Sequence, residues 1–168
     1  PKRLDCDYPF DALAGVGVAF KLILALAIKN GLKTTDVFNQ YVDIATLGTI
    51  ADVVPLLGEN RVIVDKGLKI LHNPKRIGIR AVMEVAGVLD KPLSASTIAF
   101  SIAPRLNAAG RLGSAATAVE LLLTNDESRA RELALLLDTE NKERQQTERQ
   151  IFDEALELIA KDPNFEKK

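Results

Sequence analysis

The chain has 168 residues, a formal net charge of −1, 47% hydrophobic and 27% charged residues, which is an ordinary balance for a globular protein with one sizeable core. Without an overall positive charge, it can contact a polyanion only through a few clustered arginine and lysine side chains. Its single cysteine, Cys6, excludes an internal disulfide framework. Because His72 is the single histidine, a zinc site built from cysteine and histidine is excluded as well.

The first third of the sequence predicts helical segments after a polar N-terminal loop. Residues 13–28 are apolar on nearly all sides and predict a helix buried in the middle of a domain. A lysine and two glycines interrupt this run and the flanks of a membrane span are missing, so we expect a soluble, cytoplasmic protein. A short helix is predicted over residues 35–41. Residues 44–51 predict a further helix, capped by Asp43, and a buried strand is the alternative for residues 44–47.

The middle of the chain predicts three more helical segments. The apolar positions of residues 59–73 suit an amphipathic helix, and residues 81–87 predict a short helix closed by Gly87. Ser94 or Ser96 can cap an apolar helix, which Pro104 should interrupt because proline has no backbone N–H. A further helix is expected to follow and to end near Asn125.

Residues 127–160 contain neither glycine nor proline and predict one long helix, which at 1.5 Å per residue would reach roughly 50 Å. Its two ends carry apolar stripes, with Leu133, Leu136 and Leu137 in the first and Ile151, Ala155, Leu158 and Ile159 in the second. Its centre, residues 138–150, is polar on every face. This pattern is typical of a strut between two bodies, whereas a coiled coil would need a heptad sustained through the centre.

One acidic residue, Asp52, stands inside the apolar and small-residue run of residues 45–57. We expect its carboxylate to be drawn out of water, which is costly unless a cation or several donors meet it. Asp52 could be a residue at a helix end, ahead of Pro55 and satisfied by backbone N–H groups. The other interpretation is that it serves as an oxygen ligand for Mg²⁺ or Mn²⁺. The residues alone leave both interpretations open.

A second unusual stretch, residues 104–113, sets Arg105, Asn107 and Arg111 among alanines and glycines. If it is helical, Asn107 and Arg111 share a face, since they are four residues apart. Two guanidinium groups and an amide that converge on one spot would bind a phosphate through charge-assisted hydrogen bonds. The alternative is that the arginines are salt-bridge partners between domains, and the pattern does not decide between the two.

The chain resembles the RecJ family of single-strand-specific 5′→3′ DNA exonucleases, within the DHH phosphoesterase superfamily. The resemblance lies in four runs, which occur in family order and cover residues 8 to 155: YPFDALAGVGVAFKL, ATLGTIADVVPLLGENRVIV, APRLNAAGRL and DTENKERQ. The runs GTIADVVPL and PRLNAAGR are each specific to the family.

This resemblance implies a phosphodiesterase core that holds two Mn²⁺ or Mg²⁺ ions. In the family pattern the aspartate of the TIADV motif is a metal ligand, and that aspartate is Asp52. The asparagine and arginines of PRLNAAGR face substrate phosphates, so Arg105, Asn107 and Arg111 would inherit that role. Arg111 would in addition be catalytic together with Asp52, as the charge that stabilises the transition state.

The sequence lacks several motifs of the complete family pattern. The upstream DxD motif, the next aspartate motif and the Asp-His-His motif are absent, as is the downstream glycine-rich DHHA1 motif. We therefore expect an excised, inactive piece of a longer enzyme. Residues 1–125 would be the C-terminal part of the catalytic core, and residues 126–168 a long helix toward a DHHA1-type domain. The fold class expected is mainly α in this piece, as part of an α/β core.

The resemblance also suggests partners. The substrate would be single-stranded DNA, degraded in recombination and repair, and the enzyme would work beside a helicase and a single-strand-binding protein, away from membranes. Two other functions remain open from the sequence. A related phosphoesterase could act on short oligonucleotides, cyclic dinucleotides or pyrophosphate, and a helical module without enzymatic activity could use the arginines for protein contacts.

Overall fold

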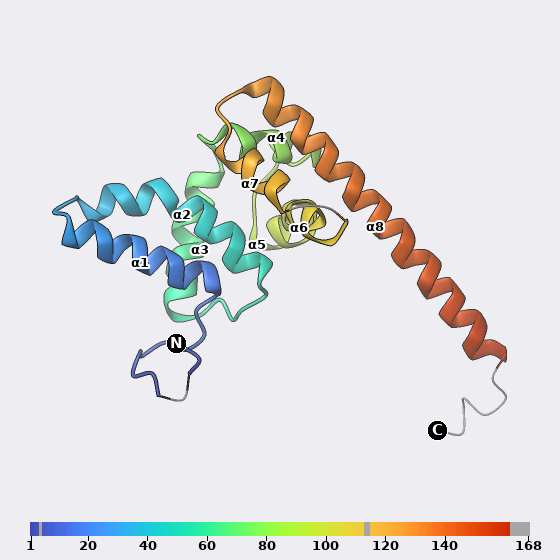
Figure 1. Cartoon of the computed structure of the whole chain (residues 1–168), viewed down its shortest axis with the longest axis horizontal. Coiled ribbons are helices and arrows are strands. Elements are labelled where there is room, and N and C mark those ends of the chain that lie inside the picture. Colours follow the sequence, from blue (N-terminus) through green and yellow to red (C-terminus); the bar gives the residue numbers. More distant parts are fainter. Residues whose placement is uncertain (4, 113–114, 162–168) are drawn as a thin grey trace.

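The computed structural model describes residues 1–3, 5–112 and 115–161, and within these residues it contains helices and no strand, as the sequence predicts. The helices are α1 (Gly15–Lys29), α2 (Thr34–Ala51), α3 (Gly58–Leu71), α4 (Ile77–Val85), α5 (Ala95–Thr97), the π-helix η1 (Ile98–Ile102), α6 (Ala103–Leu112), α7 (Ala116–Leu123) and α8 (Glu127–Lys161). Figure 1 shows α1, α2 and α3 on one side and α4, α6 and α7 beside the first half of α8. Among the described residues, none of the helices could serve as a membrane-spanning segment.

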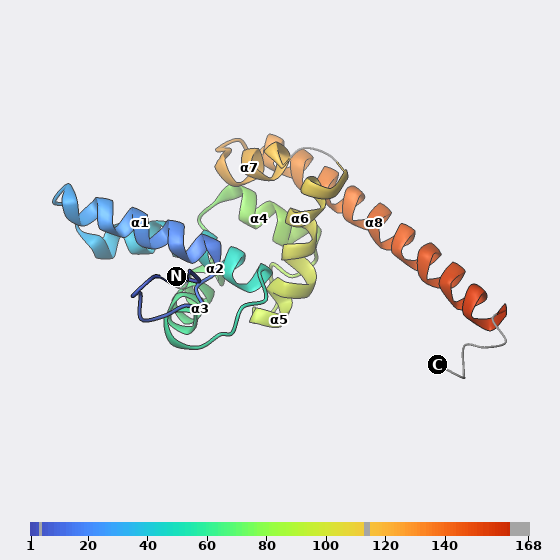
Figure 2. The same cartoon turned by 60° about the horizontal axis from the view of Figure 1, so that its bottom comes forward.

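Two apolar clusters hold these helices together. The smaller joins α1, α2 and α3 through Leu13, Phe20, Val42, Ala45 and Ile63. The larger collects buried side chains from α3, α4, η1, α7 and α8, including Leu71, Ile79, Val82, Ile98, Ile102, Leu121, Leu133 and Leu137. Helix α2 contributes to both clusters, since Leu47 and Ile50 of its last turns belong to the larger one. The C-terminal end of α2 therefore lies against η1 and α6, as Figure 2 shows.

Helix α2 is continuous where the sequence predicts a break or a strand. The expected role of Asp43 is to cap a new segment, but the residue lies inside the helix and is buried. Its carboxylate accepts a hydrogen bond of 2.9 Å from Nε of Arg76, which also donates to the carbonyl oxygen of Gln40. The partner that satisfies Asp43 is thus 33 residues away. A local pattern cannot reveal such a partner, which is why the predicted break is wrong.

Two further expectations about helices are wrong. Helix α1 is not buried on all sides, because the side chains of Leu22 and Ile28 are 61% and 68% exposed. Pro104 does not interrupt its helix. The π-helix η1 precedes it, with the N–H of Ala103 donating to the carbonyl of Ile98, and Pro104 is then the second residue of α6. Proline is tolerated there, since the first turn of a helix does not need that N–H.

The predicted long helix is confirmed as α8, which has 35 residues. Its first half is embedded in the larger cluster, where the buried positions are Ala130, Leu133, Ala134, Leu137, Asp138 and Asn141. From residue 145 to residue 161 every residue is exposed, and in Figure 1 this half projects away from the other helices. The apolar side chains of Ile151 and Phe152 on this half are each 62% exposed.

Candidate functional site

Asp52 is the residue that ends α2, and its side chain is exposed. The expectation that its carboxylate is buried is therefore wrong. Within the described part of the chain, no hydrogen bond or ion pair reaches this carboxylate. It also stands at the negative end of an 18-residue helix, where a carboxylate is disfavoured by about 0.3–1 kcal/mol. A cation bound at this place would remove that repulsion, so the position suits a metal ligand better than a structural cap.

The backbone directly after Asp52 is strained. Val53 has φ of 55°, the left-handed region that glycine usually fills at the end of a helix, and its side chain is 87% exposed. For a β-branched residue this conformation costs on the order of 1–2 kcal/mol. The strain fixes the direction in which the chain leaves α2, and with it the place of Asp52.

Asn60 holds the loop that follows. Its side chain is fully buried at the start of α3, and its amide donates to the carbonyl oxygens of Ala12 at 2.7 Å and Pro55 at 3.0 Å. The loop between α2 and α3 is thereby tied to the segment before α1. Two constraints thus follow Asp52 directly in the chain: the strained turn at Val53 and the hydrogen-bonded carbonyl of Pro55.

A pocket of about 410 Å³ opens beside Asp52, between the end of α2, the η1–α6 segment and α8. Its lining residues are Ile50, Ala51, Val53, Ala99, Phe100, Ala103, Pro104, Asn107 and Arg144. The two neighbours of Asp52 in the chain, Ala51 and Val53, are both part of this lining. The polar side chains in it are those of Asn107 and Arg144, and no carboxylate of the described residues lines it.

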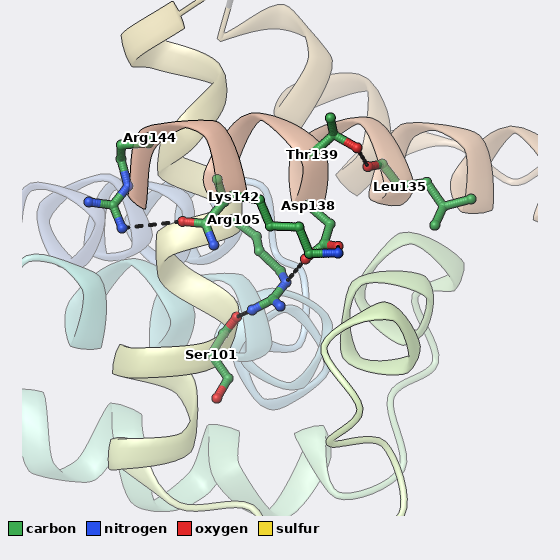
Figure 3. Close-up of polar contacts among 8 residues, drawn as sticks. Ser101, Arg105, Leu135, Asp138, Thr139, Lys142 and Arg144 are labelled. Atoms are coloured by element: carbon green, nitrogen blue, oxygen red, sulfur yellow. Dashed lines mark hydrogen bonds and ion pairs between the residues drawn. The ribbon is translucent and has the colours of Figure 1, made fainter. Parts of the chain in front are cut away.

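Arg105 does not reach this pocket. Its Nε donates to Oδ1 of Asp138 on α8 at 2.8 Å, and one of its terminal nitrogens donates to the carbonyl oxygen of Ser101. Figure 3 shows the guanidinium between these two groups. The side chains of Arg105 and Asp138 are 17% and 8% exposed. These contacts match the salt-bridge interpretation of Arg105, with the ion pair joining α6 to α8.

Asp138 is paired on both of its oxygens, since Nζ of Lys142 lies 2.7 Å from Oδ2. Burial by itself would raise the pKa of the Asp138 carboxyl. The hydrogen bond from Lys142 and the charge of Arg105 outweigh burial and hold this pKa below its ordinary value. The group therefore stays ionised in the folded chain at neutral pH, and its ion pair fastens α8 to α6.

We expect Asp138→Asn to destabilise the protein by about 3 kcal/mol, because the half-buried Arg105 would lose its counter-charge. The effect should depend on pH. Since the pKa of Asp138 is lower in the folded than in the unfolded chain, its contribution is fully present above about pH 4 and is lost as the pH falls through the lowered value. Urea unfolding of the original protein and of Asp138→Asn, at pH 7 and near pH 3, measures the difference in the free energy of unfolding. Asp153→Asn, on the exposed half of α8, is the matched control, and an equal loss in both variants would contradict the prediction.

Asn107 and Arg111 are the other two residues of the PRLNAAGR run that the sequence predicts to bind phosphate. Asn107 is exposed on α6, at the pocket, and its amide has no hydrogen-bond partner within the described residues. Arg111 belongs to α6, but its side chain lies outside the described part of the structure. Of the three predicted phosphate-binding residues, Asn107 is therefore the one whose side chain the described structure places beside the turn of Asp52.

The described residues do not contain a metal site. Among them, no group of three or more histidine, cysteine, aspartate or glutamate side chains could hold a metal ion. Asp52 supplies one carboxylate ligand, and one carboxylate cannot hold two divalent ions. The chain by itself therefore does not fit the two-metal centre that its resemblance implies.

Sequence reasoning missed Arg144 and Phe100 at the pocket, and the buried residues Asp138 and Asn141 of α8. A signal for the last two exists. The buried positions 130, 133, 134 and 137 continue with helical spacing to 138 and 141, so the buried stripe of α8 runs on into the part that looks polar on every face. Phe100 has no such signal, because its neighbours in an apolar helix are buried while it is 80% exposed.

Comparison with solved structures indicates the class of protein that this fold resembles. No protein-family model matches the chain. Solved structures of metal-bound exonucleases contain the same arrangement of helices. A manganese-bound exonuclease superposes with a TM-score of 0.81 at 39% identity, over 92% of this chain and 38% of its own. A Mg²⁺ complex from Thermus thermophilus gives a TM-score of 0.79 at 40% identity, over 90% of this chain and 23% of its own.

These exonucleases are RecJ, and curated RecJ sequences agree with the structural match. The single-stranded-DNA-specific exonuclease RecJ of Bacillus subtilis is 43% identical over 159 residues, which are 95% of this chain and 19% of that protein. RecJ of Haemophilus influenzae is 44% identical over 94% of this chain and 29% of its own length, and RecJ of Escherichia coli is 41% identical over 96% and 30%. The chain is thus similar in sequence and in fold to one segment of RecJ, and it spans between about a fifth and a third of the length of these relatives.

Proposed function

We propose that this chain is a segment of a metal-dependent exonuclease that degrades single-stranded DNA from the 5′ end, in recombination and repair. The observation that carries the proposal is the match to RecJ over nearly the whole chain, in sequence and in fold at once. Both stretches that stand out by their chemistry, around Asp52 and in PRLNAAGR, lie within that segment.

In this proposal Asp52 is one of the ligands of Mn²⁺ or Mg²⁺, the metals present in the similar RecJ structures. Its exposed, unpaired carboxylate supports the role, since a ligand must be free to meet ions held mainly by other groups. Those groups would belong to parts of the longer protein that this chain does not contain. The isolated chain is therefore expected to be inactive.

The phosphate-binding role of Arg105, Asn107 and Arg111 stays a prediction. Asn107 suits it, because its amide is exposed beside the turn of Asp52. For Arg105 the two described contacts favour a positioning role, in which its ion pair with Asp138 fixes α6 and hence Asn107. Arg111 is proposed to stabilise the transition state.

We further propose that residues 1–125 with the first half of α8 belong to the catalytic core, and that the second half of α8 leads to a DHHA1-type domain. The burial of Leu133 and Leu137 and the exposure of residues 145–161 support this division within the helix. A helicase and a single-strand-binding protein are the partners proposed, and the cytoplasm is the location, because DNA processing takes place there.

The proposal is tested with the longer protein that contains this chain. Single-stranded DNA labelled at either end, a blunt duplex of the same sequence, and dinucleotides should be compared as substrates. We expect rapid release of a 5′ label from the single strand, little attack on the duplex, loss of activity with EDTA and recovery with Mn²⁺ or Mg²⁺. A preference for dinucleotides would instead identify a related phosphoesterase, and activity that survives EDTA would contradict the proposal.

A further inference from the structure

Arg144 is held at the edge of the pocket beside Asp52 by groups of its own helix. One terminal nitrogen donates to Oε2 of Glu148 at 2.8 Å. The other lies 3.4 Å from Oδ1 of Asn141, the contact marked by the dashed line from Arg144 in Figure 3. The Asn141 side chain is 2% exposed, so its position is fixed by the core around it. Glu148 is 69% exposed, and an ion pair with such a residue is weak in water. Arg144 is therefore aimed at the pocket by Asn141 and is free to change its anionic partner.

The electrostatics of the pocket favour an anion. An arginine carries five N–H donors, and two of those of Arg144 are engaged, which leaves three without a partner among the described residues. The amide of Asn107 lines the same pocket, and no carboxylate of the described residues contributes to the lining. A guanidinium with free donors binds phosphate oxygens through paired, charge-assisted hydrogen bonds.

Phe100 adds a contact of a different kind. Its side chain lines the pocket from η1 and is 80% exposed, although its neighbours Ile98 and Ile102 are fully buried. An aromatic ring exposed beside a cation is the usual platform for a base of a single strand, because every base has a face that stacks. The ring and the guanidinium together match the two parts of a nucleotide.

We propose that this pocket is a nucleotide subsite, in which Arg144 binds a backbone phosphate and Phe100 stacks on a base of the single strand. The inference rests on the proposed function and deepens it, because it assigns substrate contacts to two residues outside the PRLNAAGR run. It also places a substrate phosphate next to the turn that carries Asp52, since Ala51 and Val53 line the same pocket.

Binding of a fluorescent oligo(dT) to the longer protein, without cleavage because EDTA is present, tests the subsite over a range of salt concentrations. We expect Arg144→Gln to weaken binding about tenfold and to reduce the slope of log affinity against log salt by about 0.7, the loss of one phosphate contact on a single strand. Arg144→Lys should keep the slope. Arg149→Gln, the same change on the exposed part of α8, should leave affinity and slope unchanged.

For Phe100, we expect Phe100→Leu to weaken binding about tenfold without a change in the salt slope, and Phe100→Tyr to bind as the original protein does. If Arg144→Gln lowers the melting temperature but leaves the salt slope unchanged, Arg144 is structural and the inference is wrong. It is equally wrong if Phe100→Leu binds normally, since the ring would then face other parts of the protein. If the original protein degrades single strands but both variants bind them normally, the subsite is wrong and the proposed function still stands. If the original protein does not degrade single strands, the proposed function is wrong.

Discussion

Replacing Asp52 by asparagine in the longer protein is expected to lower the rate of single-strand digestion by more than about a hundredfold. Loss of groups that only support a metal ligand already costs about 10- to 100-fold, and Asp52 is proposed to be a ligand itself. Asparagine keeps the shape of the side chain but removes the negative charge that would face the ions. Measuring rates over a titration of Mn²⁺ should show that the variant needs far more metal, if activity is recovered at all.

The fold should survive this change. The Asp52 carboxylate is exposed and has no partner among the described residues, and its removal relieves the repulsion at the end of α2 by about 0.3–1 kcal/mol. The melting temperature should therefore stay the same or rise slightly. Asp90→Asn, at another exposed position, is the control and should leave the rate unchanged. If Asp52→Asn digests single strands at the original rate, Asp52 does not bind the metal.

Gly78→Ala should destabilise the protein by about 3 kcal/mol or more, the upper end of what overpacking a core costs. A Cβ atom at Gly78 would lie 1.7 Å from the carbonyl oxygen and 2.6 Å from the carbonyl carbon of Leu121. Both atoms belong to backbone in α7, so the clash can be relieved only by moving α4 away from α7, which opens the larger apolar cluster. Thermal unfolding of the longer protein, followed by circular dichroism, should show a lower midpoint for this transition.

The matched control is Gly15→Ala. It makes the same chemical change in a helix, but nothing lies within 4 Å of the Cβ position at Gly15. Alanine is favoured over glycine within a helix by roughly 0.5–1 kcal/mol, so this variant should be as stable as the original or slightly more so. Equal losses in the two variants would mean that the close contact between α4 and α7 is not what makes Gly78 necessary.

The sequence predicts those parts of the fold that local residues determine. The limits of α8 follow from the absence of glycine and proline, and Ser94 caps α5 as expected by accepting a hydrogen bond from the N–H of Thr97. The continuity of α2 depends instead on Arg76, which approaches Asp43 only after the chain has folded back. The π-helix before Pro104 likewise depends on packing around Ile98 and Ile102, which no local pattern specifies.

Some residues of the candidate site could likewise be found from the sequence, and others only from the folded structure. Asp52 and Asn107 stand out in the sequence because polar residues in an apolar or small-residue run need a reason. The pairing of Arg105 with Asp138 joins residues 33 apart, so the composition of the run could not distinguish it from phosphate binding. Arg144 could not be found because its significance comes from a pocket formed by three separate stretches of chain.

The way α8 is anchored has a mechanical consequence. Residues 142–161 extend beyond the buried half, and at 1.5 Å per residue they form a lever about 30 Å long. A rotation of about 5° at the anchored end would move the far end by roughly 2.5 Å. The ion pair between Arg105 and Asp138 joins α8 to α6 just before this exposed segment, so it opposes such a rotation.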